Sequence, residues 1–188
     1  MSYFIQSGNR VELVSDESIR VFDKLPPRTY RVGYDQRKDE YFLEPIDDFV
    51  VPSKIYGDTS KKAERILRTF NLRPNATGVH LNGTKGSGKT LLSKLVSRDA
   101  LNQGYATIVV NQPYYGDVFN QFIQSIDCPA VIIFDEFEKV YTWDKQPMLL
   151  TLLDGVYPSK KLFILTTNET DHVVGQLKNR PGRIFYTF

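Results

Sequence analysis

The sequence predicts an α/β fold in which a mostly parallel β-sheet is packed between helices. From residue 58 onward, short apolar segments of strand length alternate with segments whose apolar residues recur at helical spacing. Strands that are separated by helices of this length are typical of a parallel sheet, because each parallel connection needs a crossover. A glycine-rich loop also stands between the first of these strands and the next helix.

The individual elements follow from the spacing of apolar residues. The first helix has Ala63, Ile66, Leu67 and Phe70 on one face, and Pro74 stops it soon afterwards. Further helices are expected around residues 91–96, 118–126 and 147–153. Strands are expected at residues 78–81, 105–110, 130–134, 162–166 and 184–188. Together they predict a three-layer α/β/α sandwich around a five-stranded sheet.

The first 50 residues have a different pattern and are predicted to form a small β-rich N-terminal region, residues 1–50. Residues 28–34 and 41–43 are expected to be two short strands that are joined by the polar turn 35–40. The linker 51–54 follows. Residues 51–188 are then expected to form the α/β core.

Composition excludes several classes of protein. The chain has 188 residues, of which 41% are hydrophobic, which is enough to build a core and excludes global disorder. A net charge of +2 does not suggest a protein that coats nucleic acid or an anionic membrane. The single cysteine, Cys128, excludes an intramolecular disulfide. Since no apolar run has the length of a signal peptide or a membrane helix, we expect a cytoplasmic protein, in bacteria or in a phage-infected host cell.

Residues 83–90 have the sequence GTKGSGKT, which matches the phosphate-binding pattern G-x-x-x-x-G-K-[ST] between a strand and a helix. The glycines let backbone N–H groups approach phosphate oxygens, and the following helix directs its positive end at them. Lys89 is expected to reach the β- and γ-phosphates of ATP or ADP, and the Thr90 hydroxyl to bind Mg²⁺. The expected binding residues are Gly83, Thr84, Lys85, Gly86, Ser87, Gly88, Lys89 and Thr90. The Lys85 side chain is expected to face solvent, and an accidental glycine-rich turn is the alternative interpretation.

Polar side chains follow two of the apolar strands. Asp135 and Glu136 end the strand 130–134, where Asp135 would hold Mg²⁺ and Glu136 would deprotonate a water molecule. Asn168 ends the strand 162–166, where it could hydrogen-bond the γ-phosphate and the attacking water. The alternatives are an exposed acidic loop, since Glu138 and Lys139 follow, and a turn-forming asparagine.

Two arginines flank a constrained turn near the end of the sequence. Residues 180–183 are Arg-Pro-Gly-Arg, and Pro181 and Gly182 impose the turn. Arg180 and Arg183 are candidates for stabilising the charge on a γ-phosphate that is bound to a neighbouring subunit. A pair of solvated arginines before a strand is the alternative.

The order of these motifs resembles the AAA+ ATPases. The segments concerned are GTKGSGKT, VIIFDE, TTN and NRPGR, and the last is similar to the second region of homology of the AAA clade. Residues 152–155 also resemble the leucine-rich segment of that clade. The resemblance covers about residues 55–188 and is nearest to bacteriophage-type AAA ATPases.

This resemblance implies a ring, usually of six subunits, with Mg²⁺ and ATP bound between neighbours. By position, Glu136, Asn168, Arg180 and Arg183 would be catalytic, with both arginines acting on the adjacent subunit. Tyr56 and Gly57 lie where family members hold the adenine by backbone contacts. Residues Tyr114, Tyr115 and Gly116 resemble the pore loop that grips a polypeptide, although an ordinary aromatic turn remains an equal alternative. We expect no helical lid after the last strand within these 188 residues.

Three functional hypotheses follow. The first is an ATP-driven machine that remodels a protein substrate. The second is a nucleic-acid-associated ATPase such as a helicase loader or replication accessory factor, which the basic residues of the N-terminal region motivate. Acidic residues are interspersed among those basic ones, so that no basic stripe is evident. The third is a nucleotide-binding scaffold that recruits a partner.

Overall fold

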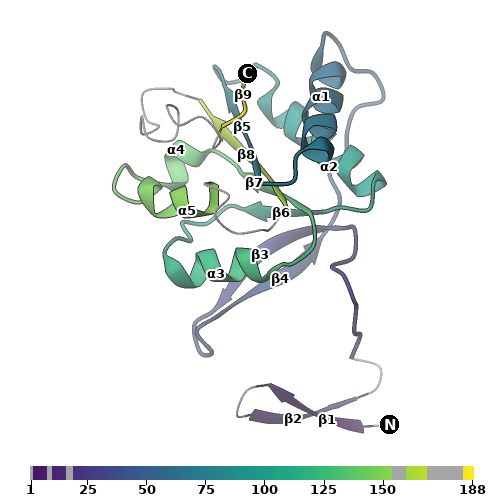
Figure 1. Ribbon diagram of the computed structural model, residues 1–188, viewed down its shortest axis with the longest axis vertical. Helices are drawn as coiled ribbons and strands as arrows, with labels where there is room; N and C mark the ends of the chain where they lie inside the picture. Colours follow the sequence, from purple (N-terminus) through teal and green to yellow (C-terminus); the bar gives the residue numbers. More distant parts are fainter. Residues whose placement is uncertain (1, 8–9, 16–18, 154–159, 169–183) are drawn as a thin grey trace.

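The computed structural model describes residues 2–7, 10–15, 19–153, 160–168 and 184–188 (Figure 1). Its main feature is a seven-stranded sheet with the strand order β4-β3-β6-β7-β8-β5-β9. The strands are β3 (Thr29–Asp35), β4 (Glu40–Ile46), β5 (Thr77–Asn82), β6 (Ala106–Val110), β7 (Ala130–Phe134), β8 (Lys161–Thr167) and β9 (Tyr186–Thr187). A separate two-stranded sheet consists of β1 (Ser2–Ser7) and β2 (Arg10–Ser15).

Six of the seven strands run parallel to one another, which confirms the predicted α/β fold, although the sheet has seven strands where five were expected, because β3 and β4 join it. β6 pairs with β7, β7 with β8, β8 with β5, and β5 with β9, all in parallel. Every residue of β7 and of β8 is buried, because helices cover both faces of the sheet. The last strand is shorter than expected, since only Tyr186–Thr187 pairs with β5.

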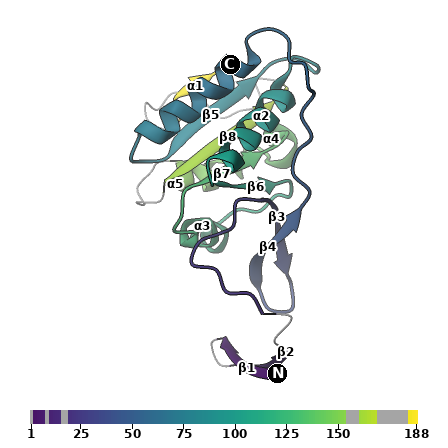
Figure 2. The same cartoon turned by 90° about the vertical axis from the view of Figure 1, so that its right-hand side faces the viewer.

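Helices form one layer on each side of the sheet (Figure 2). The helices are α1 (Thr59–Leu72), α2 (Lys89–Asn102), α3 (Asp117–Ser125), α4 (Phe137–Val140) and α5 (Leu150–Leu153). Ile133 packs in one cluster with α1 and α2, whereas Ile132 packs in the other with α3, α4 and α5. Neighbouring residues of a strand point to opposite faces of the sheet, so that one apolar strand packs against the helices on both sides.

The first helix and the later helical segments bear out the sequence pattern with one refinement. The four residues predicted for the buried face of α1 are at most 2% exposed. Where one helix was expected from Pro147, a 3₁₀ turn at Gln146–Leu149 precedes α5. No helix within the described ranges combines the length and the apolar character that a membrane span needs.

The N-terminal hairpin of β3 and β4 is joined to the main sheet, whereas the sequence suggested a region of its own. β3 pairs in parallel with β6, with Thr29 opposite Thr107. Tyr30 and Val32 are buried, and Arg31 on the other face forms an ion pair with Glu44. The hairpin thereby covers the edge that β6 would otherwise leave open. The division at residue 50 stays a prediction, but the hairpin belongs to the sheet of the core.

Lys161, at the start of β8, is a fully buried basic residue. Its Nζ atom donates hydrogen bonds to the carbonyl oxygens of Ile126, at 2.6 Å, and Cys128, at 3.0 Å. Burial disfavours the charged ammonium and lowers the pKa of Lys161 from 10.5 to about 8. The side chain fixes the loop that leads from α3 into β7.

We expect the free energy of unfolding to rise by about 2 kcal/mol between pH 7.5 and pH 9.5 because of Lys161. Below pH 8, Lys161 is protonated in the folded and in the unfolded state, so that the folded protein bears the full cost of burying a charged ammonium group. Above it the unfolded chain binds more protons than the folded one, and stability increases with pH. Urea unfolding at the two pH values measures how steeply the free energy of unfolding changes with pH. Lys161→Met should flatten it, and an unchanged slope in that variant would contradict the assignment.

Candidate nucleotide-binding site

The predicted phosphate loop, residues 83–90, connects β5 to α2. Gly83, Gly86 and Gly88 have φ angles of 150°, 88° and 92°, in a region that side-chain-bearing residues rarely adopt. A Cβ atom at Gly83 would also lie 2.8 Å from Ser87 Oγ. The glycines therefore give the loop its shape, and α2 begins directly behind it with free backbone N–H groups.

Lys89 lies on the inner side of this loop. Its Nζ atom donates hydrogen bonds to the carbonyl oxygens of Gly83 and of Thr84, the latter at 3.0 Å, and contacts Ser87 Oγ at 3.4 Å. The ammonium group is thus held over the loop by oxygen atoms of the loop itself. This places a positive charge where phosphate oxygens would bind.

A cavity of about 190 Å³, the phosphate cavity, lies between this loop and the ends of β7 and β8. Its lining comprises Lys85, Gly86, Ser87, Gly88, Lys89, Thr90, Asp135, Glu136, Thr166 and Asn168. Three adjacent strands supply these residues, because β7, β8 and β5 are neighbours in the sheet. The structure therefore brings the loop, the acidic pair and Asn168 together, as the sequence predicts.

Thr166 is a member of this site that the sequence analysis missed. Its hydroxyl donates a hydrogen bond to Asp135 Oδ1 at 2.6 Å and accepts one from the backbone N–H of Glu136 at 2.9 Å. One side chain thus orients both members of the acidic pair. The sequence contains Thr166 in the segment TTN but gives no sign of this role, because threonine is common in strands.

The oxygen ligands of the phosphate cavity suit Mg²⁺. Thr90 and Asp135 line it together, and Asp135 keeps its second carboxylate oxygen for another partner. Mg²⁺ is usually bound by one or two carboxylates together with waters and phosphates. The described residues include no cluster of three or more His, Cys, Asp or Glu side chains that could hold a metal ion.

Glu136 has a strained backbone and a carboxylate that is kept ionised. Its φ and ψ angles are 48° and 47°, in the left-handed region, which is a rare conformation for glutamate and is often found at functional sites. A hydrogen bond from Lys139 lowers the pKa of Glu136, and Asn168 and the charge of Lys85 lower it further. The carboxylate is therefore ionised, which is the form that can accept a proton, although the ion pair with Lys139 makes it a weaker base than a free glutamate.

Asn168 is held by Glu138, which the sequence suggested only as part of an exposed loop. Glu138 Oε1 accepts hydrogen bonds from the backbone N–H of Asn168 at 2.8 Å and from its Nδ2 at 3.0 Å. The acidic pair is followed by the helix α4, in which Phe137 is 1% exposed. The alternative of an exposed acidic loop is therefore wrong for this segment. Glu138 resembles any surface acid in the sequence, and only its hydrogen bonds to the distant Asn168 identify it.

Replacing Glu138 with alanine should lower kcat for ATP about tenfold, because Asn168 would lose the acceptor that fixes its amide. KM should change by less than about twofold, since the phosphate loop is untouched. Glu138→Gln keeps a carbonyl oxygen at the same position and should restore most of the rate. Steady-state kinetics of the three proteins measure the difference, and an unchanged kcat in the alanine variant would contradict this role.

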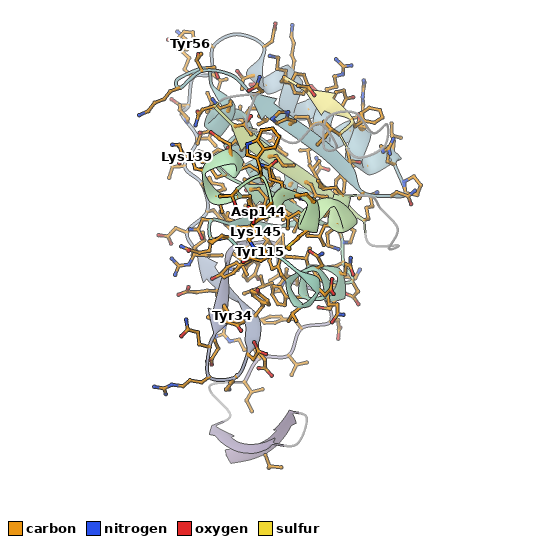
Figure 3. The ribbon with its side chains drawn as sticks, turned by 90° about the vertical axis from the view of Figure 1, so that its left-hand side faces the viewer. Tyr34, Tyr56, Tyr115, Lys139, Asp144 and Lys145 are labelled. Carbon is orange, nitrogen blue, oxygen red and sulfur yellow. The ribbon has the colours of Figure 1, made fainter. Side chains whose placement is uncertain are left out.

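Tyr56 and Gly57, which were expected to hold the adenine by backbone contacts, directly precede α1, and this role stays a prediction. The Tyr56 side chain is 74% exposed, and Lys54 Nζ lies 5.1 Å from its ring centroid. Figure 3 shows Tyr56 well away from the labelled Lys139. Among the described residues that line the cavities beside the phosphate loop, neither Tyr56 nor Gly57 occurs. Arg180 and Arg183 lie outside the described residues.

The segment 114–116 combines a packed and an exposed aromatic residue. The Tyr114 ring contacts those of Tyr41 and Phe119, with centroids 5.2 and 5.9 Å apart. Tyr115 is 36% exposed, and Lys145 Nζ lies 4.7 Å from its ring centroid (Figure 3). Tyr114 therefore has the packing role of an aromatic turn, whereas Tyr115 is available at the surface.

A phosphate loop between β5 and α2, facing two carboxylates at the end of a parallel strand, defines a P-loop nucleoside triphosphatase. The sequence model of the ATPase family associated with various cellular activities (AAA) matches residues 79–187. The match covers more than half of the chain, and the protein therefore belongs to the AAA family of ATPases.

Individual relatives agree with this assignment. The chain is 28% identical to Protein CdcH of Halobacterium salinarum in an alignment of 141 positions that covers 65% of this chain and 19% of the relative. It is 30% identical to the peroxisomal ATPase PEX1 of Cricetulus griseus in an alignment of 130 positions that covers 57% of this chain and 10% of the relative. It is 28% identical to an AAA ATPase forming ring-shaped complexes of Corynebacterium glutamicum in an alignment of 149 positions that covers 63% of this chain and 28% of the relative. The chain thus spans less than a third of the length of these relatives.

A solved structure has the same fold. It is the crystal structure of a DNA replication initiation factor, with a TM-score of 0.51 and 18% identity, covering 71% of this chain and 47% of that chain. At this level of identity the likeness supports the α/β fold and says nothing about a shared substrate.

Proposed function

We propose that this chain binds ATP with Mg²⁺ in the phosphate cavity and hydrolyses it, working as a ring of several copies that remodels a polypeptide. The observation that supports this most is the convergence of the phosphate loop, Asp135, Glu136 and Asn168 on one cavity. A site that only bound nucleotide would not need a second carboxylate, Glu136, beside the one that would hold Mg²⁺.

Each residue has a distinct task in this proposal. Glu136 accepts a proton from the attacking water, and Asn168 orients that water against the γ-phosphate. Lys89 and the N–H groups at the start of α2 neutralise charge on the phosphate oxygens. Mg²⁺, held by Thr90 and Asp135, would supply a positive charge to the phosphates.

The ring has support from relatives and from the sequence. The Corynebacterium glutamicum relative is named as forming ring-shaped complexes. Arg180 and Arg183 are the candidates for completing the site of a neighbouring copy, and ATP would then lie between two subunits. Tyr115, with its exposed ring beside Lys145, is the candidate contact for a polypeptide.

If a neighbouring copy supplies an arginine, the ATPase rate per chain should rise with protein concentration. Arg183→Ala should lower the rate about a hundredfold at concentrations where the wild type is assembled, because the charge that develops in the transition state loses its partner. At concentrations too low for assembly the two proteins should have similar rates. Lys178→Ala, which removes a nearby positive charge outside the arginine motif, is the matched control and should behave like the wild type. A rate per chain that is independent of concentration would argue against the ring.

A second arm of the same experiment adds an unfolded polypeptide. It should stimulate hydrolysis by the wild type, whereas Tyr115→Ala should keep the basal rate and lose the stimulation. Stimulation of equal size in both proteins would exclude Tyr115 as the contact. The nucleic-acid hypothesis stays an untested prediction, and binding to DNA with a steep salt dependence would favour it.

A further inference from the structure

The positive charge of the chain is concentrated on α1 and on the residue that follows it. Positions 59–73 contain five basic residues and a single acidic one, Glu64. The basic residues are Lys61, Lys62, Arg65, Arg68 and Arg73. Because the whole chain has a net charge of only +2, the rest of the chain is net negative. One helix therefore carries a positive charge that the overall balance does not reveal.

The basic residues of α1 lie on the side of the helix that faces away from the sheet. Lys61, Arg65 and Arg68 are spaced by four and by three positions, which places them on one helix face. All three are exposed. They form a row about 10 Å long, at a rise of about 1.5 Å per residue.

Carboxylates do little to neutralise this row within the part of the chain that the structure describes. Lys61 Nζ lies 4.0 Å from Asp58 Oδ1, and both side chains are largely exposed. Among the described residues, neither Arg65 nor Arg68 forms an ion pair with a carboxylate. On the neighbouring helix α2, by contrast, a basic residue is paired with the acid next to it at 2.7 Å. The row on α1 can therefore pair with anions from outside.

Aromatic side chains of the last residues lie against the same helix, and Figures 1 and 2 show this end of the chain beside α1. The Arg73 guanidinium lies 4.7 Å from the ring centroid of Phe185, which is 46% exposed. The Arg65 guanidinium lies 4.8 Å from the ring centroid of Tyr186, and its Nε donates a hydrogen bond to the Tyr186 hydroxyl at 3.3 Å. A half-exposed aromatic ring thus stands at the carboxyl end of the row of cations.

The Tyr186 hydroxyl indicates that the potential on this side of the molecule is positive. Burial raises the pKa of Tyr186, but hydrogen bonds with Thr69 and Arg65 and the charges of Arg65 and Arg68 outweigh burial and lower it. Nearby positive charge has this effect because it stabilises the phenolate. The same potential attracts a polyanion from solution.

A row of cations beside an exposed aromatic ring is the combination that binds single-stranded nucleic acid. The cations pair with successive phosphates, and the ring stacks on a base. We propose that single-stranded DNA binds to the α1 face, which consists of Lys61, Arg65, Arg68 and Phe185. The inference goes beyond the proposed function and does not depend on ATP hydrolysis. It also moves the candidate nucleic-acid contact from the N-terminal region, where the sequence had suggested it, to α1.

Two features favour this occupant over the other polyanions. An acidic polypeptide would pair with the cations but would make no use of an exposed ring, whereas an unpaired base stacks on it. Phosphates and bases are groups that DNA already offers, and RNA would bring a 2′-hydroxyl for which the contacts of this face are not needed. A duplex would present its phosphates but keep its bases stacked inside.

Fluorescence anisotropy with a fluorescein-labelled oligo-dT of about 20 nucleotides, added to the full chain at about 50 to 200 mM salt, measures this binding. Lys61→Gln combined with Arg68→Gln should weaken it at least about tenfold. The slope of log affinity against log salt should become shallower by about 1.4, because each phosphate contact of a single strand contributes about 0.7. Lys24→Gln combined with Arg37→Gln is the matched control, which removes two charges from exposed positions of the N-terminal region and should change affinity by less than about twofold.

Phe185→Leu tests the aromatic contact and retains apolar volume. It should weaken binding about tenfold, a typical loss for one base that stacks on an aromatic side chain. The salt slope should stay at the wild-type value, because stacking releases no counterions. Phe22→Leu, at another exposed phenylalanine, is its control and should bind like the wild type.

Several results would overturn the inference. One is a wild type that does not bind oligo-dT at low salt, and another is an equal loss of affinity in the α1 pair and in the control pair. Displacement of the oligonucleotide by polyglutamate at the same concentration of charges would show that the α1 face selects negative charge alone. Tighter binding of oligo-U than of oligo-dT would assign the face to RNA. Urea midpoints that match the wild type exclude misfolding as the cause of a loss.

Discussion

Replacing Glu136 with glutamine should lower the rate of ATP hydrolysis at least about a hundredfold, because a general base contributes typically 10²- to 10⁴-fold. ATP should still bind, since Lys89, Thr90 and the loop glycines are unchanged. Glutamine keeps the size of the side chain and removes its ability to accept the proton. Phosphate release measures the rate of hydrolysis, and retention of labelled ATP on the same sample measures binding.

Control variants show whether this loss is specific. Glu64→Gln removes a carboxylate from the exposed surface of α1 and should hydrolyse ATP like the wild type. If Glu136→Gln turned over ATP at the wild-type rate, Glu136 would not be the base. The scaffold hypothesis makes a different prediction, namely that Glu136→Gln leaves the biological function of the protein intact.

Replacing Lys89 with alanine should weaken ATP binding about a hundredfold. The ammonium group lies over the phosphate loop, and a charge-assisted hydrogen bond contributes about 1.5–3 kcal/mol. Hydrolysis at subsaturating ATP should fall by the same factor. Isothermal titration calorimetry with ATP and Mg²⁺ measures the affinity.

Lys94→Ala is the matched control for this change. Lys94 belongs to the same helix, α2, and does not line either cavity beside the loop. Its removal should leave the affinity within about twofold. An equal loss in both variants would indicate general electrostatic attraction between the helix and the nucleotide, and would contradict a specific role for Lys89.

Much of this site was predictable because its signals are local. The spacing of the glycines, Lys89 and Thr90 is specific for phosphate binding, and the polar residues after β7 and β8 stand where parallel strands end. The fold class followed from the alternation of strands and helices. These inferences needed only neighbouring residues and the general geometry of parallel sheets.

The parts that were missed depend on contacts between distant residues. Nothing near Glu138 distinguishes it from a solvated acid, and its bond to Asn168 spans thirty positions. Thr166 looks like an ordinary strand threonine in the sequence, because its hydrogen bonds to Asp135 and Glu136 also join distant positions. The pairing of β3 with β6 joins residues 29 and 107, and a polar, charged segment gave no sign of it.

The central claim is that residues from three adjacent strands form one site that hydrolyses ATP. The most direct measurement is the release of inorganic phosphate from ATP by the wild-type chain, with Mg²⁺ or with excess chelator, over a range of protein concentrations. We predict phosphate release that requires Mg²⁺ and disappears in Glu136→Gln. Recovery of intact ATP from a saturated wild-type sample, at every concentration and with Mg²⁺ present, would contradict the account.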